Sequence, residues 1–135
     1  MTDSRKFSAI ILAAGKGTRM KSDLPKVLHK VAGLEMIFHV INAAQSAGVS
    51  HIAVVTSPIQ EDLRNNILAK ASDETLTMAV QQEQLGTGDA VKAAIPLAGN
   101  PDKALILFGD TPLMRPDVLQ QMVEHSADIT LLGFM

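Results

Sequence analysis

The stretch from Phe7 to Met20 reads FSAIILAAGKGTRM and joins a compact apolar run to a loop of glycine and basic residues. The apolar run, Phe7–Ala13, is far too short to span a bilayer, and small, flexible residues follow it directly. Both properties are typical of a buried strand. Ligands of open α/β sheets bind beyond the carboxyl ends of the strands, so the loop after this run is the first candidate binding segment.

Beyond this stretch, apolar runs and helical patterns alternate to the end of the chain. Further strands are predicted at His51–Thr56, Leu76–Gln81 and Ala104–Phe108, and a fifth at Asp128–Leu132. Helices are predicted at Met36–Ala47, Ile59–Lys70, Thr87–Ile95 and Pro116–His125. The alternation favours right-handed crossovers and a mainly parallel sheet with helices on both faces. The predicted fold class is therefore α/β, as one unit over 1–135 that is incomplete at its apolar C-terminus.

Residues at the ends of the predicted helices support these limits. Gly48 is placed to cap the helix 36–47, and Thr87 is the candidate N-cap of the helix that starts there. Pro116 suits the first position of the last helix, which needs no backbone N–H. The polar segment 14–34 is expected to be a long loop with one helical turn.

Composition narrows the classes of function. The 135 residues correspond to one domain, and the absence of cysteine excludes disulfides, zinc–thiolate sites and iron–sulfur clusters. The formal net charge of −2 argues against nucleic acid as a partner. No signal peptide or membrane segment is recognisable, so we expect a cytoplasmic protein with no membrane partner. Phosphate chemistry requires a local basic cluster, and one is present at Lys16, Arg19, Lys21 and Lys26.

The loop LAAGKGTRM, residues 12–20, combines small residues with positive charge. Small side chains let backbone amides approach a ligand, and successive amides in a turn can form a nest for an anion. Lys16 and Arg19 add charge where a triphosphate would lie. The residue order fits neither a Walker A loop nor the dinucleotide fingerprint. The alternative interpretation is a glycine-rich turn with solvated charges.

A second candidate binding segment, QQEQLGTGDA at residues 81–90, follows the third predicted strand. Gln81 carries an amide with donors and an acceptor, which suits the edge of a nucleobase. Gly86 and Gly88 permit close backbone approach, and Thr87 can cap the helix or contact a ligand. An ordinary strand-to-helix turn accounts for these residues equally well.

Two further candidates are charged residues in turns. Lys26 follows Pro25, whose fixed φ stiffens the approach to a lysine that would neutralise phosphate. Asp110, in GDTPL, follows the fourth predicted strand and is well placed as a carboxylate ligand of Mg²⁺. The alternatives are a surface lysine and a turn aspartate that bonds its own backbone.

Taken in order, LAAGKGTRM, DLPKVLHKVAG, QQEQLGTGDA and GDTPL resemble the motifs of the sugar nucleotidyltransferases. The segments PKVLHKVAG and EQLGTGDA are most similar to the N-terminal uridyltransferase domain of bacterial bifunctional N-acetylglucosamine-1-phosphate uridyltransferases/glucosamine-1-phosphate acetyltransferases. The resemblance covers nearly the whole chain. It implies a Rossmann-like nucleotidyltransferase fold in which 1–135 is the nucleotide-binding part. The acceptor-sugar part and the β-helix acetyltransferase domain are then absent.

The resemblance also implies a reaction. UTP and N-acetylglucosamine 1-phosphate would give UDP-N-acetylglucosamine, a cell-envelope precursor, and pyrophosphate, with Mg²⁺ as cofactor. The sugar-phosphate oxygen would attack the α-phosphorus in line. Full-length relatives are expected to be homotrimers assembled through the β-helix, which this piece need not be.

The roles implied by the resemblance fall into three groups. The nucleotide-binding residues are Leu12, Ala13, Ala14, Gly15, Lys26, Gln81, Gly86 and Thr87. The last three of these would contact the uracil. Arg19 and Lys26 would lie along the phosphates as catalytic residues, and Asp110 would be the metal ligand.

Two alternatives to the uridyltransferase interpretation remain. One is a related nucleotidyltransferase with another nucleotide or sugar, such as a molybdenum-cofactor guanylyltransferase, against which PKVLHKVAG and LGTGDA argue. The other is a UTP-binding fragment without catalysis, because the segments that hold the sugar in the family are absent.

Phe108 stands where many relatives carry tyrosine, so any contact from that hydroxyl is lost.

Overall fold

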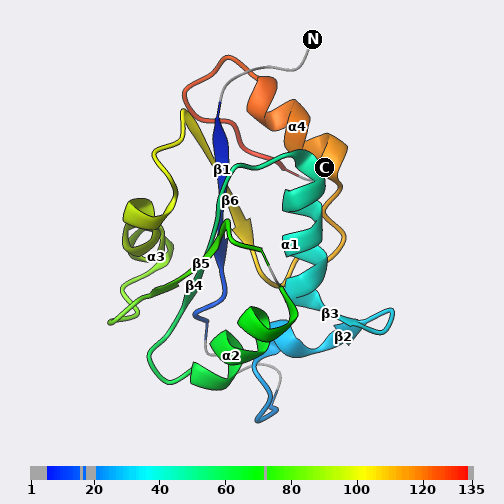
Figure 1. Cartoon of the computed structure of the whole chain (residues 1–135), viewed down its shortest axis with the longest axis vertical. Coiled ribbons are helices and arrows are strands. Elements are labelled where there is room, and N and C mark those ends of the chain that lie inside the picture. Colours follow the sequence, from blue (N-terminus) through cyan, green and yellow to red (C-terminus); the bar gives the residue numbers. More distant parts are fainter. Residues whose placement is uncertain (1–5, 16, 18–20, 72, 134–135) are drawn as a thin grey trace.

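The centre of the computed structural model, which describes residues 6–15, 17, 21–71 and 73–133, is a parallel sheet (Figure 1). Its four strands have the order β5-β4-β1-β6. They are β1 (Phe7–Leu12), β4 (Ile52–Thr56), β5 (Leu76–Val80) and β6 (Lys103–Phe108). β1 is an inner strand that pairs with both β4 and β6. Its side chains are buried on both faces, with Ile10 1% exposed on one and Ile11 0% on the other.

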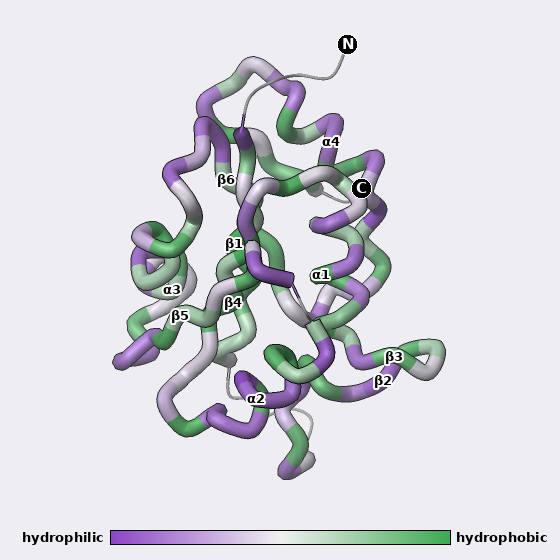
Figure 2. Tube along the Cα trace, viewed as in Figure 1, coloured by the Kyte–Doolittle hydropathy of each residue, from purple (hydrophilic) through white to green (hydrophobic). Residues whose placement is uncertain are grey.

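Helices cover both faces of the sheet (Figure 1). One face carries α1 (Met36–Ala47), α2 (Glu61–Lys70) and α4 (Pro116–Glu124). The other carries α3 (Thr87–Ala94), which a 3₁₀ turn, η3 (Ile95–Leu97), extends. Bands of hydrophobic and hydrophilic residues alternate along the helices (Figure 2), because one side of each helix packs on the sheet. Over the described ranges, no helix reaches the length and apolar content that a bilayer crossing requires.

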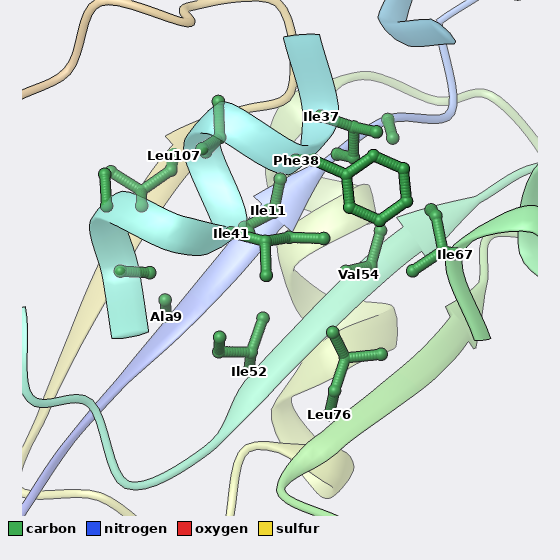
Figure 3. Packing of buried hydrophobic residues seen from close by; sticks show 14 of the residues in the cluster. Ala9, Ile11, Ile37, Phe38, Ile41, Ile52, Val54, Ile67, Leu76 and Leu107 are labelled. Carbon is green, nitrogen blue, oxygen red and sulfur yellow. The ribbon is translucent and has the colours of Figure 1, made fainter. Parts of the chain in front are cut away.

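The larger core lies between α1 and the sheet (Figure 3). Ile37 and Ile41 of α1 pack in one cluster with Ile11 of β1 and Val54 of β4, and Ile67 of α2 joins the same cluster. None of these five side chains is more than 1% exposed. Full burial of a side chain of this size contributes about 1.5–3 kcal/mol, so this face is a major source of the stability of the fold.

The α/β fold with a parallel sheet covered on both faces is confirmed. The first four predicted strands and all four predicted helices are present, with limits within two residues of those expected. Gly48 caps α1 as predicted, since its N–H donates to the carbonyls of Ala44 and Gln45. The helix α2 begins two residues late because the Gln60 Oε1 accepts from the Ser57 N–H at 2.8 Å, which forms a separate turn before the helix.

Two local predictions are wrong. Residues 128–132 do not form a strand, although they line a cavity together with β6. Ile129 and Leu131 are 80% and 88% exposed, because the described residues provide no second layer against which this apolar run is buried. Thr87 is not the N-cap of α3. That position is held by Gly86, whose φ of 109° favours glycine, and Thr87 is the first helical residue.

The segment between β1 and α1 contains one helical turn, as predicted, and a hairpin that was not predicted. The turn is η2 (Lys26–Leu28), and the hairpin joins β2 (Lys30–Val31) to β3 (Leu34–Glu35). Residues 32 and 33 of its loop both have positive φ, 51° and 81°. This is the type I′ pattern of two-residue hairpins, and the Ala-Gly sequence is a weak signal for it.

Candidate functional site

The carboxyl ends of β1, β5 and β6 open onto one cavity of about 480 Å³. Parallel strands all end on the same edge of the sheet, so the loops that follow them meet there. The cavity is lined by Leu12, Ala13, Ala14, Gly15, Gly17, Lys26, Val27, Gln81, Gln84, Gly86, Thr87, Ala90, Phe108 and Asp110. Its wall therefore comes from segments that lie far apart in the sequence.

The loop after β1 is held in place by two glutamine side chains. Gln60 donates its Nε2 to the Ala13 carbonyl at 3.2 Å, and Gln84 donates its Nε2 to the Ala14 carbonyl. Gly15 follows and is exposed. A Cβ at Gly15 would meet no atom of the described residues within 4 Å, so contacts with that part of the chain do not require glycine at this position. The backbone of the loop is thus anchored at Ala13 and Ala14, and no described residue fills the space beside Gly15.

Gln81 is the most deeply buried polar residue of the cavity wall, at 4% exposure. Its Nε2 donates to the Asp89 Oδ2 at 2.9 Å and to the Gly86 carbonyl at 3.2 Å. A carboxylate and a carbonyl only accept hydrogen bonds, so together they determine which end of the amide is nitrogen. Within the described residues, no hydrogen bond to the Gln81 Oε1 is found. Since Gln81 also lines the cavity, its Oε1 is a candidate acceptor for a ligand.

Lys26 and Asp110 form an ion pair at the cavity. The Lys26 Nζ lies 2.7 Å from the Asp110 Oδ2, and the two side chains are 41% and 34% exposed. A pair with this exposure contributes about 0–1 kcal/mol. An incoming anion and cation can therefore separate the two groups at little cost.

Gly109 sets the position of Asp110. Its N–H donates to the Leu12 carbonyl at 2.9 Å, which fastens the loop after β6 to the end of β1. A Cβ at this buried glycine would lie 3.0 Å from the Val27 side chain and 3.2 Å from the Leu12 carbonyl oxygen. The glycine allows this close approach, and the carboxylate that follows it reaches the cavity.

Nine of the ten predicted site residues line this cavity, namely Leu12, Ala13, Ala14, Gly15, Lys26, Gln81, Gly86, Thr87 and Asp110. The tenth, Arg19, lies outside the described residues. The roles assigned to the ten residues stay predictions, because the geometry shows that nine are neighbours and not what they bind.

Sequence reasoning missed three side chains that organise the cavity. Gln84 and Asp89 lie within the motif 81–90, but a polar residue at either position carries no signal of the group that it contacts. Gln60 precedes α2, outside every motif, and reaches Ala13 only because β1 and β4 are neighbours in the sheet. Such contacts follow from the topology and have no local signature.

The donor set at Asp110 fits a metal that arrives with a nucleotide. Among the described residues that line the cavity, Asp110 is the one carboxylate. In the described part of the chain, no group of three or more His, Cys, Asp or Glu residues is arranged to hold a metal. Mg²⁺ commonly takes one or two carboxylates and completes its shell with water and phosphate oxygens. The site therefore matches this mode of binding better than a cage built of protein ligands alone.

Comparison with known proteins gives a family match, similar sequences and similar solved structures. Residues 9–132 match the family described as MobA-like NTP transferase domain. The bifunctional protein GlmU of Parvibaculum lavamentivorans is 47% identical over 130 residues, which cover 93% of this chain and 28% of the relative. The protein of the same name from Cereibacter sphaeroides (strain ATCC 17025 / ATH 2.4.3) is 46% identical over 94% of this chain and 28% of its own length.

The fold has solved counterparts. A nucleotidyl transferase from Methanothermobacter thermautotroptrophicus matches with a TM-score of 0.70 at 23% identity, over 89% of this chain and 57% of that one. This likeness confirms the fold. The chain spans 28% of the length of the curated relatives named above, so it corresponds to one portion of proteins of that kind.

Proposed function

Since this chain belongs to the MobA-like NTP transferase domain family, we propose that its cavity binds UTP for transfer of a uridylyl group to N-acetylglucosamine 1-phosphate. The observation that carries the proposal is the meeting of nine predicted site residues, from separate loops, in a single cavity. The 47% identity to a protein named bifunctional protein GlmU agrees with the motif resemblance on the type of enzyme. The choice of UTP and N-acetylglucosamine 1-phosphate comes from the motif resemblance.

The nucleotide is bound by the loop after β1 and by the loop before α3. The backbone from Ala13 to Gly15 lies along the nucleotide, since all three residues line the cavity. The Gln81 Oε1 accepts a hydrogen bond from the N3–H of uracil. Gly86 and Thr87 complete the wall around the base.

The phosphates lie toward Lys26 and Asp110. Lys26 leaves its ion pair and neutralises phosphate charge, and Arg19 has the same proposed role. Asp110 holds Mg²⁺, which, when bound, supplies positive charge to the phosphate oxygens. An oxygen of the sugar phosphate forms a bond to the α-phosphorus, and the bond from that phosphorus to the β-phosphate oxygen breaks. Pyrophosphate then leaves with the electron pair, so the chain contributes mainly positioning and charge neutralisation.

A second candidate function is nucleotide binding without catalysis. The specific observation in its favour is that the chain spans 28% of the length of its curated relatives. The groups that bind the acceptor sugar then belong to the portion of those relatives that the chain does not match. In this case the cavity binds UTP, and pyrophosphate is not released.

The two candidates are separated by calorimetric titration of the chain with UTP in the presence of Mg²⁺, together with an assay of pyrophosphate release. Binding with release when N-acetylglucosamine 1-phosphate is added supports the transferase, and binding alone supports the binding module. If the chain is folded by circular dichroism and yet does not bind UTP, both proposals are wrong.

The proposed metal ligand is tested with Asp110→Asn. We expect Mg²⁺-dependent affinity for UTP to fall about tenfold, or 1.4 kcal/mol, because Asp110 is the one carboxylate among the described residues of the cavity wall. The matched control is Asp117→Asn, since the Asp117 carboxylate also lies 2.7 Å from a basic group, Arg115, but at the start of α4. The control should bind UTP as the wild type does. Equal UTP affinity in both variants would remove Asp110 from the metal site.

A further inference from the structure

The orientation of the Gln81 amide is set by groups outside the ligand site. Its nitrogen has two hydrogens, and the structure gives the nitrogen two acceptors, the Asp89 Oδ2 and the Gly86 carbonyl. A rotated amide would place its oxygen against both of these acceptors and lose both hydrogen bonds. The Asp89 contact is the shorter of the two, 2.9 Å against 3.2 Å, and its acceptor is charged. Charge-assisted hydrogen bonds of this kind are the stronger ones.

From this arrangement we infer that Asp89 is a positioning residue that determines base specificity by holding the Gln81 Oε1 toward the cavity. The inference rests on the proposed function and assigns Asp89 a role in it. Asp89 itself is not in the wall of the cavity. It acts on the ligand only through Gln81.

With its orientation fixed, the Gln81 amide favours a base whose N3 carries a proton. Uracil has a hydrogen on N3 and donates it to the Gln81 Oε1. Cytosine has a lone pair on N3, so the two acceptors face each other and neither is satisfied. Once a base fills the cavity, an acceptor on its wall is shut off from water, and leaving it unpaired is the larger part of such discrimination. Gln81 lines the cavity and is 4% exposed as a residue, so a bound base that does not donate leaves its Oε1 without a partner.

Asp89 is itself held by its place in the fold. It lies in the first turn of α3, where the partial positive charge of the helix N-terminus stabilises a carboxylate. Residues Ala90 and Ala94 of the same helix are 5% and 0% exposed against the sheet, so the helix is anchored by its buried side. Gln81, the other residue of the contact, is also attached: its backbone N–H donates to the Thr56 carbonyl at 2.8 Å. Both ends of the contact are therefore attached to rigid elements.

Two effects of Asp89 on a nucleotide can be separated. Its negative charge repels any triphosphate, and that effect is the same for UTP and CTP. Its hold on the Gln81 amide changes the ratio of the two affinities, because the two bases differ at N3. A residue with only a structural or electrostatic role moves both affinities together, whereas a positioning residue moves the ratio.

The test is calorimetric titration of the wild type, Asp89→Ala, Asp89→Asn and Asp62→Asn with UTP and with CTP. We expect Asp89→Ala to reduce the UTP/CTP affinity ratio about tenfold, because the amide then turns more freely. Asp89→Asn keeps an oxygen that accepts from Gln81 and should retain a ratio between those of Asp89→Ala and the wild type. Asp62→Asn removes a carboxylate from the first turn of α2 and should leave the ratio unchanged.

The outcomes distinguish this inference from the proposed function. If the wild type prefers UTP and Asp89→Ala keeps that preference while folded, the inference is wrong and the proposed function stands. If the folded wild type does not bind UTP, the proposed function fails and the specificity role fails with it. The side-chain amide of Gln81 gives a second readout by nuclear magnetic resonance without a nucleotide. Its two N–H signals should change in Asp89→Ala and not in Asp62→Asn, and unchanged signals in Asp89→Ala would overturn the positioning role.

Discussion

The two faces of the sheet are packed with side chains of different size. Among the described residues, the face under α1 holds a cluster of 21 buried residues, most of them isoleucine, leucine, valine or phenylalanine. The face under α3 holds eight, of which six are alanine: Ala14, Ala53, Ala79, Ala90, Ala94 and Ala98. The distance between packed elements depends on the side chains at the contact, so small residues let α3 lie close to the strands. The α1 face thus contributes most of the buried apolar area, and the α3 face brings its helix close to the strands.

This proximity forms one side of the cavity. Ala14 and Ala90 belong to the cluster of small residues and also line the cavity, so the loop after β1 and the first turn of α3 are neighbours. The same closeness lets Gln81 reach Asp89. The α3 face also ends before β6, where Ile106 and Phe108 are 41% and 48% exposed. The candidate site therefore borders this uncovered part of the sheet, and the larger apolar cluster lies on the opposite face.

The largest expected effect is on the α1 face, where Ile41→Ala should lower the free energy of unfolding by about 2–5 kcal/mol. Ile41 is 1% exposed in the centre of the larger cluster, and its truncation leaves a cavity there. The measurement is urea denaturation, with Leu68→Ala as the control because Leu68 is 51% exposed on α2. If the two variants lose the same free energy, the two faces do not differ in the way described.

A smaller effect on stability, with a larger effect on binding, is expected for Ala94→Leu. Ala94 is fully buried between α3 and the sheet, so a larger side chain moves the helix outward and costs about 1–3 kcal/mol. UTP affinity should fall as well, because α3 carries part of the cavity wall. The control is Ala93→Leu on the same helix, at a position that is only partly buried. Unchanged UTP affinity in a destabilised Ala94→Leu would contradict the link between close packing and the cavity.

The smallest effect concerns pH and again belongs to the α1 face. A hydrogen bond from the Lys70 ammonium holds the pKa of the Glu35 carboxyl below its ordinary value and links the start of α1 to α2. A lowered pKa in the folded state contributes stability above the unfolded pKa of about 4.3, and that stability is lost as the pH falls through the folded pKa. Glu35→Gln should therefore be up to about 1 kcal/mol less stable than the wild type near pH 6.

The difference between Glu35→Gln and the wild type should shrink as the pH falls from 5 to 3, in a series of urea denaturations. Acid sensitivity persists in the variant, because a hydrogen bond from the Thr75 hydroxyl also lowers the pKa of Asp73. Since Lys70 is 49% exposed, the ion pair is partly screened by solvent. A stability gap that stays constant over this pH range would show that Glu35 acts by packing and not by its charge.

Local patterns in the sequence were sufficient for much of the fold. The alternation of apolar runs and amphipathic helices predicted the parallel sheet, and residues such as Gly48 marked where helices end. The pattern failed at 128–132, where an apolar run has no strand pairing in the described part of the chain. Whether such a run pairs depends on a neighbouring edge at the right distance and angle, and periodicity along the chain contains no information about that.

The sequence by itself determined the order of the elements and the segments that carry chemistry, because strand and helix periods and glycine-rich turns are local properties of the chain. Only the tertiary structure decided the contacts between those segments. They are the ion pair of Lys26 with Asp110, the hydrogen bond from Gln60 to the loop after β1, and the orientation of the Gln81 amide. Each of these joins residues through the crossovers of the sheet. Their distances depend on how closely the helices pack, and that depends on the size of side chains elsewhere in the sequence.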